Sequence, residues 1–336
     1  MSRKEDRMSK KVSYESVLGP YMEELLRMKR AQGMDSTTLS WIFNDLDKYV
    51  LRAGLKDTFV TETWYNQWKE SQNNICERTL YHKCSAWRQL LSYKSKRGCH
   101  CFIPRLPRRP RSSFVPYIFS KKQIEALFMA IDNQKYLSND KRNGLFSMPA
   151  LLRLLYSTGL RVSEALALKN KDVDMSIGII KIRDSKNNSE RMVALCESMK
   201  KVLLDYLEYR NSLSLKDLTD PERPLFIRLD GDSLTKTTVY RFFYRSCEDA
   251  GIELQGRSIG PTVHSLRHTS ATHALAKMSD EGIDIYTALP ILSSSLGHMK
   301  PSSTEYYVRL TLSMFPDIED RVSSINEFVF PKTSRL

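Results

Sequence analysis

A proline- and arginine-rich segment at 103–116 limits how this chain can fold. The segment reads IPRLPRRPRSSFVP and holds four prolines and four arginines. Proline lacks a backbone N–H and clashes with the preceding helical turn, so the stretch favours an extended, semi-rigid strap over a helix. A chain of 336 residues is long for one domain and comfortable for two. We therefore predict that 103–116 is an interdomain linker.

Before the linker, the chain shows only the periodicity of helices. Apolar residues recur at three- and four-residue intervals over 14–32, 37–53 and 77–97, which is the spacing of one helical face. No stretch alternates in the way that a half-buried strand does. The pattern predicts a basic tail over residues 1–13 and an all-helical domain over 14–102.

Basic side chains gather on the helix at 77–97 and in the linker. One side of this helix carries apolar residues for packing, and the basic residues, Lys94 among them, face another side. That face could be merely solvated, and so could the linker. The expected phosphate contacts are Arg78, Lys83 and Arg88 in the helix and Arg105, Arg108, Arg109 and Arg111 in the linker.

After the linker, helices surround a small sheet. Ser120 and Gln123 form a capping box that opens a helix. Segments 177–183 and 191–195 alternate as two strands joined by the polar loop 184–190, and everything beyond looks helical. The fold class that we predict is mainly α: a helical N-terminal domain plus a mixed α+β domain with a small antiparallel sheet.

The mixed domain is expected to span 117–336, with a C-terminal tail from about residue 310. The tail contains an amphipathic segment at 316–328. Its apolar stripe must be buried somewhere, either on its own domain or on a neighbouring protomer.

The charge balance narrows the class of partner. A formal charge of +13, from 52 Lys and Arg against 39 Asp and Glu, favours a polyanion over a merely solvated basic surface. No apolar run reaches the ~20 residues of a membrane span, and the polar start at 1–12 is no secretory signal. We therefore expect a cytoplasmic protein with no membrane partner and reduced cysteines. Cys99, His100 and Cys101 are too close together for the usual zinc spacing, so we predict no metal site.

Two short segments carry residue types suited to phosphate chemistry. In TGLRVSEAL, a glycine ends one helix, Ser163 can cap the next, and Arg161 sits in the connection. In HSLRH, His264 and Arg267 share one helical face. An imidazole and a guanidinium on one face are uncommon in a core, because both are costly to bury unpaired.

Two adjacent tyrosines follow a third segment, LGH, which ends at His298. Neighbours on a helix point about 100° apart, so only one of Tyr306 and Tyr307 can face the arginines. A tyrosine with its pKa near ~10 is a poor nucleophile at neutral pH and needs a nearby base or a positive field, and His264 and the arginines can offer both.

Taken in order, these segments resemble the signature of the tyrosine recombinase (phage integrase) family. The resemblance covers most of 117–336, and the N-terminal half resembles the family's helical core-binding domain in layout only. The catalytic set that the resemblance implies is Arg161, Lys186, His264, Arg267, His298 and Tyr307.

In that set, Arg161 and Arg267 match the two arginines that clamp the phosphate. Bidentate guanidiniums can stabilise the extra charge on the non-bridging oxygens without a metal ion. The family's spacing from His298 selects Tyr307 over Tyr306 as the nucleophile. Rejoining would need no ATP, because a phosphotyrosine keeps the energy of the broken bond.

The lysine of the set lies on the hairpin before the strand that reads RMVAL. The resemblance implies Lys186, although Ser185 and Asn187 stand where glycines are common, and Lys181 is the alternative. His268 also fits the family pattern, and we expect it to pack between helices rather than to catalyse.

The resemblance implies a site-specific DNA recombinase that acts through a 3′-phosphotyrosine and a Holliday junction, without a cofactor. The expected partners are double-stranded DNA with inverted-repeat sites, a tetrameric synaptic complex and accessory DNA-bending proteins. The expected setting is a mobile element, and the expected location is the nucleoid. The alternatives are a DNA-relaxing enzyme like type IB topoisomerases and a non-catalytic DNA-binding protein of the same fold.

Overall fold

The computed structural model describes residues 13–110, 115–135, 140, 142–183, 190–254, 260–297 and 302–315. The chain divides into two compact units, Met1–Ser113 and Phe114–Leu336. The predicted fold class, mainly helical with one small antiparallel sheet, is confirmed. No helix in the described ranges is long and apolar enough to cross a membrane.

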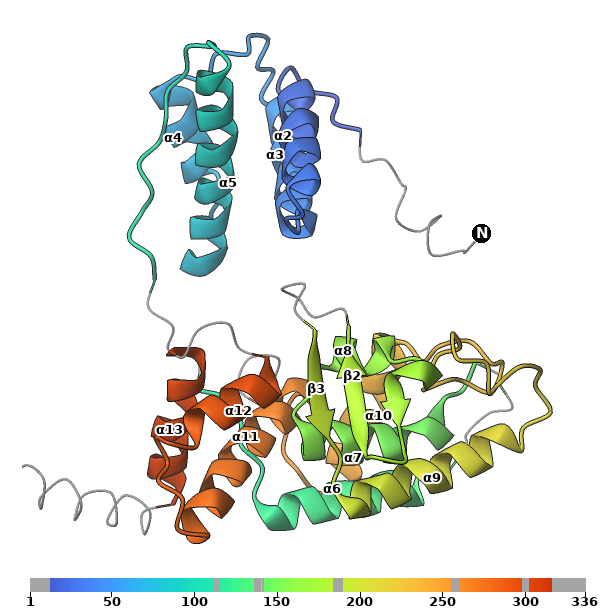
Figure 1. The fold of residues 1–336 in the computed structure, drawn as a ribbon. Helices are drawn as coiled ribbons and strands as arrows, with labels where there is room; N and C mark the ends of the chain where they lie inside the picture. The colour runs from blue at the N-terminus through green and yellow to red at the C-terminus, as the bar shows by residue number, and fades with distance from the viewer. Residues whose placement is uncertain are drawn as a thin grey trace, which may run out of the picture. The chain divides into compact units, whose positions relative to one another are not determined.

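The regular elements in the described part of the first unit are all helices (Figure 1). Its helices are α2 (Gly19–Ala31), α3 (Thr37–Arg52), α4 (Glu62–Glu70) and α5 (Glu77–Lys96). Helix α2 begins later than the periodicity predicts, because the segment from Tyr14 forms a turn. The carboxylate of Asp47 accepts hydrogen bonds of 3.0 Å from the backbone amides of Glu15 and Ser16 and holds that turn on α3.

An aromatic cluster forms the core of this unit. Trp68 and Trp87 are fully buried with ring centroids 5.6 Å apart in an edge-to-face arrangement, and Tyr65 lies 6.4 Å from Trp87. Edge-to-face rings add about 0.5–1.5 kcal/mol per pair beyond the burial of their area. The cluster packs α4 against α5, and α4 is a helix that the sequence pattern had not predicted.

Lys94 does not lie on the basic side of α5, contrary to the expectation from the sequence. Its side chain is fully buried, its Nζ donates to the carbonyl oxygen of Thr58, and it lies 4.8 Å from the centroid of the Tyr21 ring. Burial lowers the pKa of Lys94. The lysine therefore belongs to the packing of α2 and α5, where it has a carbonyl and an aromatic face as partners.

The second unit combines its small sheet with helices that lie behind it, below it and at one end of the unit in Figure 1. These are α6 (Lys121–Asn133), α7 (Met148–Thr158), α8 (Val162–Ala167), α9 (Glu197–Asn211), α10 (Lys236–Asp249), α11 (Val263–Asp280), α12 (Leu289–Leu296) and α13 (Ser302–Met314). The expectation that everything beyond the strands is helical is wrong for 212–235. That stretch consists of turns and isolated bridges, such as Ile227 with Ser233.

The sheet has three strands in the order β1-β2-β3, all antiparallel. Strands β2 (Ile179–Ile182) and β3 (Arg191–Ala194) fall within the two predicted segments. Strand β1 (Val173–Asp174) was not predicted, because two residues are too few to show alternation. Lys181 pairs with Met192 across the hairpin, so Lys181 lies on the body of the sheet.

Helix α11 connects two hydrophobic clusters. Its first turns, with Val263 and Leu266, belong to the large cluster built on α6, α7, α9, α10 and the sheet. Its later turns, with Leu275, belong to a smaller cluster shared with α12 and α13. Figure 1 shows α11, α12 and α13 together at one end of this unit, with β3 the nearest strand. The turn of α11 that carries Arg267 and His268 therefore lies between the turns that belong to the two clusters.

Candidate active site

Arg161 lies in a tight connection between two helices. Gly159 ends α7 with φ +63°, a left-handed conformation that glycine adopts without strain. Arg161 is the residue that precedes α8, and its backbone amide donates to the Glu164 carboxylate at 2.9 Å. Ser163 therefore does not cap α8, as its sequence position had suggested, but lies inside the helix. The side chain of Arg161 is also bound to Glu164, with Nη1 2.7 Å from Oε1.

Arg267, in the segment HSLRH, contacts the other two signature segments, TGLRVSEAL and LGH. Its guanidinium is buried, and it donates to the carbonyl oxygen of Gly159 at 2.7 Å and to that of Leu296 at 2.7 Å. One acceptor precedes Arg161, and the other lies at the end of α12, directly before Gly297. Burial and the positive charge of Arg161 lower the pKa of Arg267 to about 10, so it remains a cation at neutral pH.

A buried carboxylate links the turn before α8 to the sheet. Glu164 is bound by Arg191 of β3, with Nη2 2.8 Å from Oε2, and the Nε of Arg191 donates to Ser295 O at 2.9 Å. Burial alone would raise the pKa of Glu164, but hydrogen bonds from Arg191 and Arg161 lower it to about 2. Glu164 is therefore an anion that orients both arginines and sets the position of β3 relative to α12.

His264 lies in the first turn of α11, three residues before Arg267. The residue is exposed at the surface of the helix, and its ring meets that of His268 edge to face with centroids 4.7 Å apart. Partial loss of solvent and the charges of Arg267 and Arg161 lower the pKa of His264. The imidazole is therefore neutral at pH 7 and able to accept or donate one hydrogen bond.

The two tyrosines of α13 differ in environment. Tyr307 is 3% exposed and packs in the smaller cluster, whereas Tyr306 is 36% exposed. The hydroxyl of Tyr307 lies 3.0 Å from Nδ1 of His268. Burial raises the pKa of Tyr307, and the nearby charges of Arg267 and Arg161 act in the opposite direction. Of the two phenols, Tyr307 is therefore the one that lies beside both arginines.

Two members of the predicted catalytic set, Lys186 and His298, lie outside the described residues, as does the predicted amphipathic segment 316–328. The alternative lysine, Lys181, is bound to Glu190, with Nζ 3.1 Å from Oε2. The structure thus brings together Arg161, His264, Arg267 and Tyr307 from three elements.

The predicted phosphate contacts in the first unit divide into three groups. Exposed side chains are those of Arg78, Arg88, Arg105, Arg108 and Arg109. Lys83, in contrast, is bound to the carboxylate of Asp45 and donates to Gln72 Oε1 at 2.8 Å. Arg111 lies outside the described residues. An ion pair competes with phosphate for the charge of Lys83, so the exposed arginines are the better candidates.

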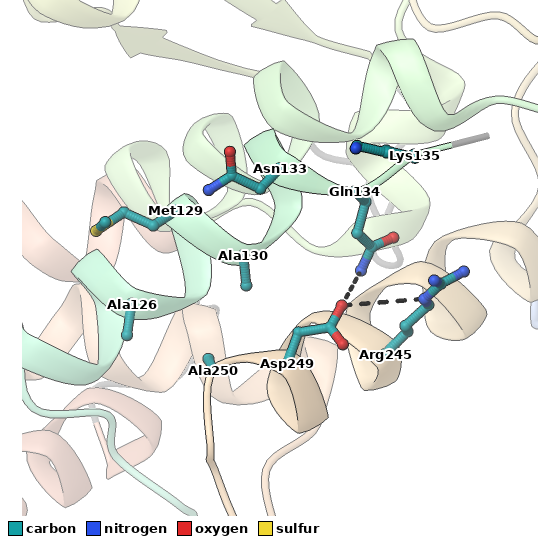
Figure 2. Close-up of a pocket in the computed structure, with 9 residues that line it drawn as sticks. All are labelled: Ala126, Met129, Ala130, Asn133, Gln134, Lys135, Arg245, Asp249 and Ala250. Atoms are coloured by element: carbon teal, nitrogen blue, oxygen red, sulfur yellow. Dashed lines mark hydrogen bonds and ion pairs between the residues drawn. The ribbon is translucent and has the colours of Figure 1, made fainter.

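A separate cavity of about 640 Å³ lies between α6 and α10 (Figure 2). In it, Asp249 meets Gln134 Nε2 at 3.4 Å and Arg245 Nε at 3.9 Å. None of the four predicted catalytic residues that the structure describes lines this cavity. It is therefore not part of the candidate site.

Three residues of the site were not assigned a part in the chemistry from the sequence: Glu164, Arg191 and His268. Glu164 stands three positions after Arg161 at the start of a short helix, which is the spacing of a capping carboxylate. The sequence contained no signal for the contact of Arg191 with Glu164, because that contact joins a strand to a distant helix. His268 was expected to pack between helices, and its ring does contact Tyr307 of α13; in addition, its Nδ1 meets the hydroxyl of that residue.

Comparison with known proteins identifies the class of protein that this fold and site define. Residues 118–313 match the model of the phage integrase family, so the chain belongs to that family. It is similar to the tyrosine recombinase XerC of Thermodesulfovibrio yellowstonii, with 30% identity over 303 residues that cover 88% of this chain and 93% of that protein. The resemblance inferred from the signature residues is thereby confirmed, and the chain is an enzyme of the tyrosine recombinase class.

Solved structures share the fold. The XerH site-specific recombinase in a post-cleavage complex with palindromic difH substrate has a TM-score of 0.61 at 21% identity, over 85% of this chain and 78% of that one. A lambda integrase (75-356) dimer bound to a COC′ core site has a TM-score of 0.61 at 17% identity, over 86% and 94%. At these identities the likeness concerns the fold alone.

Proposed function

We propose that this protein cleaves and rejoins double-stranded DNA through a 3′-phosphotyrosine at Tyr307. The observation that carries the proposal is the position of Arg267, whose hydrogen bonds to Gly159 O and Leu296 O gather the three signature segments. Arg161 and Tyr307 lie beside it. Two cations next to a phenol can stabilise the charge that develops when the phenol attacks a phosphodiester.

The two arginines supply the electrostatic part of the reaction. In the transition state, phosphorus is five-coordinate and its non-bridging oxygens carry extra charge. Glu164 holds the guanidinium of Arg161 in one orientation, with Nη1 2.7 Å from Oε1. A preoriented guanidinium needs little reorganisation during the reaction. His264 lies beside the same guanidiniums and can donate to a phosphate oxygen, and His298 completes the proposed set.

The departing 5′ oxygen of deoxyribose needs a proton, and we assign this proton to Lys186. The ion pair of Lys181 with Glu190 favours this assignment. A lysine bound to a carboxylate must give up that ion pair before it can protonate a leaving group.

The same chemistry, repeated on two duplexes, would exchange strands through a Holliday junction. Support comes from the fold shared with XerH on its difH substrate and with the lambda integrase dimer on its core site. We propose inverted-repeat sites, a tetrameric synaptic complex and accessory DNA-bending proteins, with action in the cytoplasm at the nucleoid. The family's description as phage integrases favours a mobile element as the setting.

The two units would have different roles, one in binding DNA and the other in cleaving it. We propose that residues 14–102 form the core-binding domain, that 103–116 lies along phosphates, and that 117–336 holds the catalytic site. The exposed arginines at 105, 108 and 109 support the second assignment. The tail beyond about residue 310 would dock on its own domain or on a neighbouring protomer.

The test is covalent capture on a DNA substrate with a nick close to the cut, resolved on a denaturing gel. We expect Tyr307→Phe to abolish the protein–DNA adduct while site binding in a gel shift is unchanged, because only the hydroxyl is lost. Tyr306→Phe is the matched control and should retain the adduct. The adduct should also form in EDTA, because the arginines provide the charge stabilisation.

An adduct that survives in Tyr307→Phe and disappears in Tyr306→Phe would reverse the assignment of the nucleophile. A requirement for Mg²⁺ would contradict the mechanism. A supercoil-relaxation assay and a two-site recombination assay, run with the same protein, separate recombination from topoisomerase activity and from binding alone.

A further inference from the structure

The contact between Tyr307 and His268 has no role in the reaction described so far. The phenolic oxygen lies 3.0 Å from Nδ1 of His268, and the two rings are 5.6 Å apart at their centroids. His268 is on α11, one residue after Arg267, and Tyr307 is on α13. The contact therefore joins the helix of the phosphate-binding arginine to the helix of the nucleophile.

The chemistry of the neighbouring groups limits which of them can take a proton from this phenol. Arg267 and Arg161 are cations and have no acceptor. The carboxylate of Glu164 is already bound to both Arg161 and Arg191. A neutral imidazole with its proton on Nε2 has a lone pair on Nδ1, and Nδ1 is the atom that faces Tyr307.

The position of the second imidazole supports the same assignment. His264 meets the edge of the His268 ring with centroids 4.7 Å apart, and the exposed His264 lies one helical turn earlier on α11. His268 thus contacts both the imidazole of His264 and the phenol of Tyr307. In this arrangement His264 can serve the phosphate while His268 serves the nucleophile.

We propose that His268 is the general base that accepts the phenolic proton of Tyr307 during cleavage. This inference rests on the proposed function, in which Tyr307 is the nucleophile. As the Tyr307 oxygen forms its bond to phosphorus, the O–H bond breaks and the proton moves to Nδ1 of His268. The P–O5′ bond breaks, and the 5′ oxygen takes its proton from the proposed acid, Lys186. In rejoining, His268 returns the proton to the departing tyrosine oxygen.

The environment of Tyr307 explains why such a base is needed. Burial raises the pKa of this phenol, so little tyrosinate exists at neutral pH despite the two nearby cations. A base within hydrogen-bond distance removes the proton as the new bond forms, and such catalysis typically contributes about 10²–10⁴ in rate.

The experiment compares two variants of the full-length protein by single-turnover cleavage of the nicked substrate. His268→Phe keeps an aromatic ring and removes the acceptor, and His268→Asn keeps a polar atom near the position of Nδ1 without its basicity. We expect both to cleave about 10²-fold to 10⁴-fold more slowly than the original protein. Their affinity for the site in a gel shift should be unchanged.

The chain offers a matched control on the same helix. Nδ1 of His273 lies 2.9 Å from the hydroxyl of Tyr156, a second histidine–tyrosine contact of α11 that does not involve the proposed nucleophile. His273→Phe should cleave within about twofold of the original rate, which separates loss of the base from disturbance of α11. Circular dichroism of all three variants checks that they fold.

A substrate with sulfur at the 5′ bridging position distinguishes the base from the acid. Sulfur leaves without a proton, so this substrate should rescue Lys186→Ala and leave His268→Phe slow. If His268→Asn cleaves at the original rate, His268 only positions the hydroxyl and the proposal is wrong. The proposal is also wrong if the sulfur substrate restores the rate of His268→Phe. An adduct in Tyr307→Phe would instead refute the proposed function itself.

Discussion

At the scale of single residues, the site depends on one buried anion among several cations. Glu164 is 2% exposed at its side chain and binds both Arg161 and Arg191. A buried carboxylate is tolerated only when its hydrogen bonds are made, and removal of its charge leaves the guanidiniums without a counterion. Glu164 is therefore expected to stabilise the second unit as well as to orient Arg161.

We predict that Glu164→Gln destabilises the second unit by about 3 kcal/mol at pH 7, from the difference between a folded pKa of about 2 and an ordinary value of 4.5. Because the folded pKa is lowered, this stabilisation is complete above pH 4.5 and disappears as the pH falls towards 2. Urea unfolding followed by circular dichroism at several pH values measures it. A difference between the two proteins that stays constant from pH 7 to pH 2 would contradict the prediction.

The chain contains an internal control for this measurement. All four tryptophans lie in the first unit, so tryptophan fluorescence reports the unfolding of that unit. We expect the fluorescence transition to be the same in Glu164→Gln and in the original protein. A shift of the fluorescence transition would mean that the substitution acts beyond the second unit.

At the scale of elements, two glycine turns bring the signature segments within reach of one another. Gly159 ends α7 and Gly297 ends α12, both in the left-handed region. A Cβ on Gly159 would lie 2.7 Å from Leu296 Cδ2, and one on Gly297 would lie 2.8 Å from Arg191 Nη1. Glycine has no side chain, so the end of α7 can pack closely against Leu296 and the end of α12 against Arg191.

We predict that Gly159→Ala reduces cleavage at least tenfold with little change in DNA binding. The strained backbone and the overlap with Leu296 would displace the carbonyl that Arg267 holds, and binding energy spread over the DNA backbone would change little. Single-turnover cleavage and a gel shift measure the two effects.

Gly251→Ala is the matched control, because Gly251 has φ +66° and a Cβ added there would have nothing within 4 Å. It should lose stability by roughly 1 kcal/mol from the left-handed backbone alone and keep its cleavage rate. Equal rates in the Gly159 and Gly251 variants would show that the turn before Arg161 tolerates displacement.

At the scale of the whole molecule, a polyanionic partner would be bound by many weak charge contacts. The chain carries a formal charge of +13, and exposed arginines occur in the linker at 105, 108 and 109. Two of them, Arg108 and Arg109, line a cavity of about 670 Å³ with Lys69 and Glu77 of the first unit. Contacts of this kind set affinity and its dependence on salt rather than the choice of sequence.

We predict that replacing Arg105, Arg108 and Arg109 together with alanine lowers the slope of log affinity against log salt by about 2 to 3, since each phosphate contact contributes about 0.9. Affinity should fall equally for specific and unrelated DNA. Lys83→Ala is the control, because Lys83 is bound to Asp45. In this variant the slope of log affinity against log salt should change by less than the value of about 0.9 expected for one phosphate contact. A triple variant with the original slope would place the linker away from phosphates.

The sequence alone was sufficient for the fold class, the family and the residues that carry its signature. Helical periodicity, the proline-rich segment and the capping box at Ser120 are local, and the structure bears out the helices and the capping box. The order and spacing of the segments around Arg161, Arg267 and Tyr307 were enough to indicate the family. Such features are readable because they depend on neighbours along the chain.

Only the tertiary structure determined how those residues act on one another. The contact of Lys94 with Tyr21, the pairing of Glu164 with Arg191 and the contact of His268 with Tyr307 each join side chains from different elements. Periodicity assigns a residue to a face of its own helix and says nothing of the side chain that it will meet there. Whether a histidine packs or accepts a proton depends on that partner, and the partner is supplied by the packing of α13 against α11.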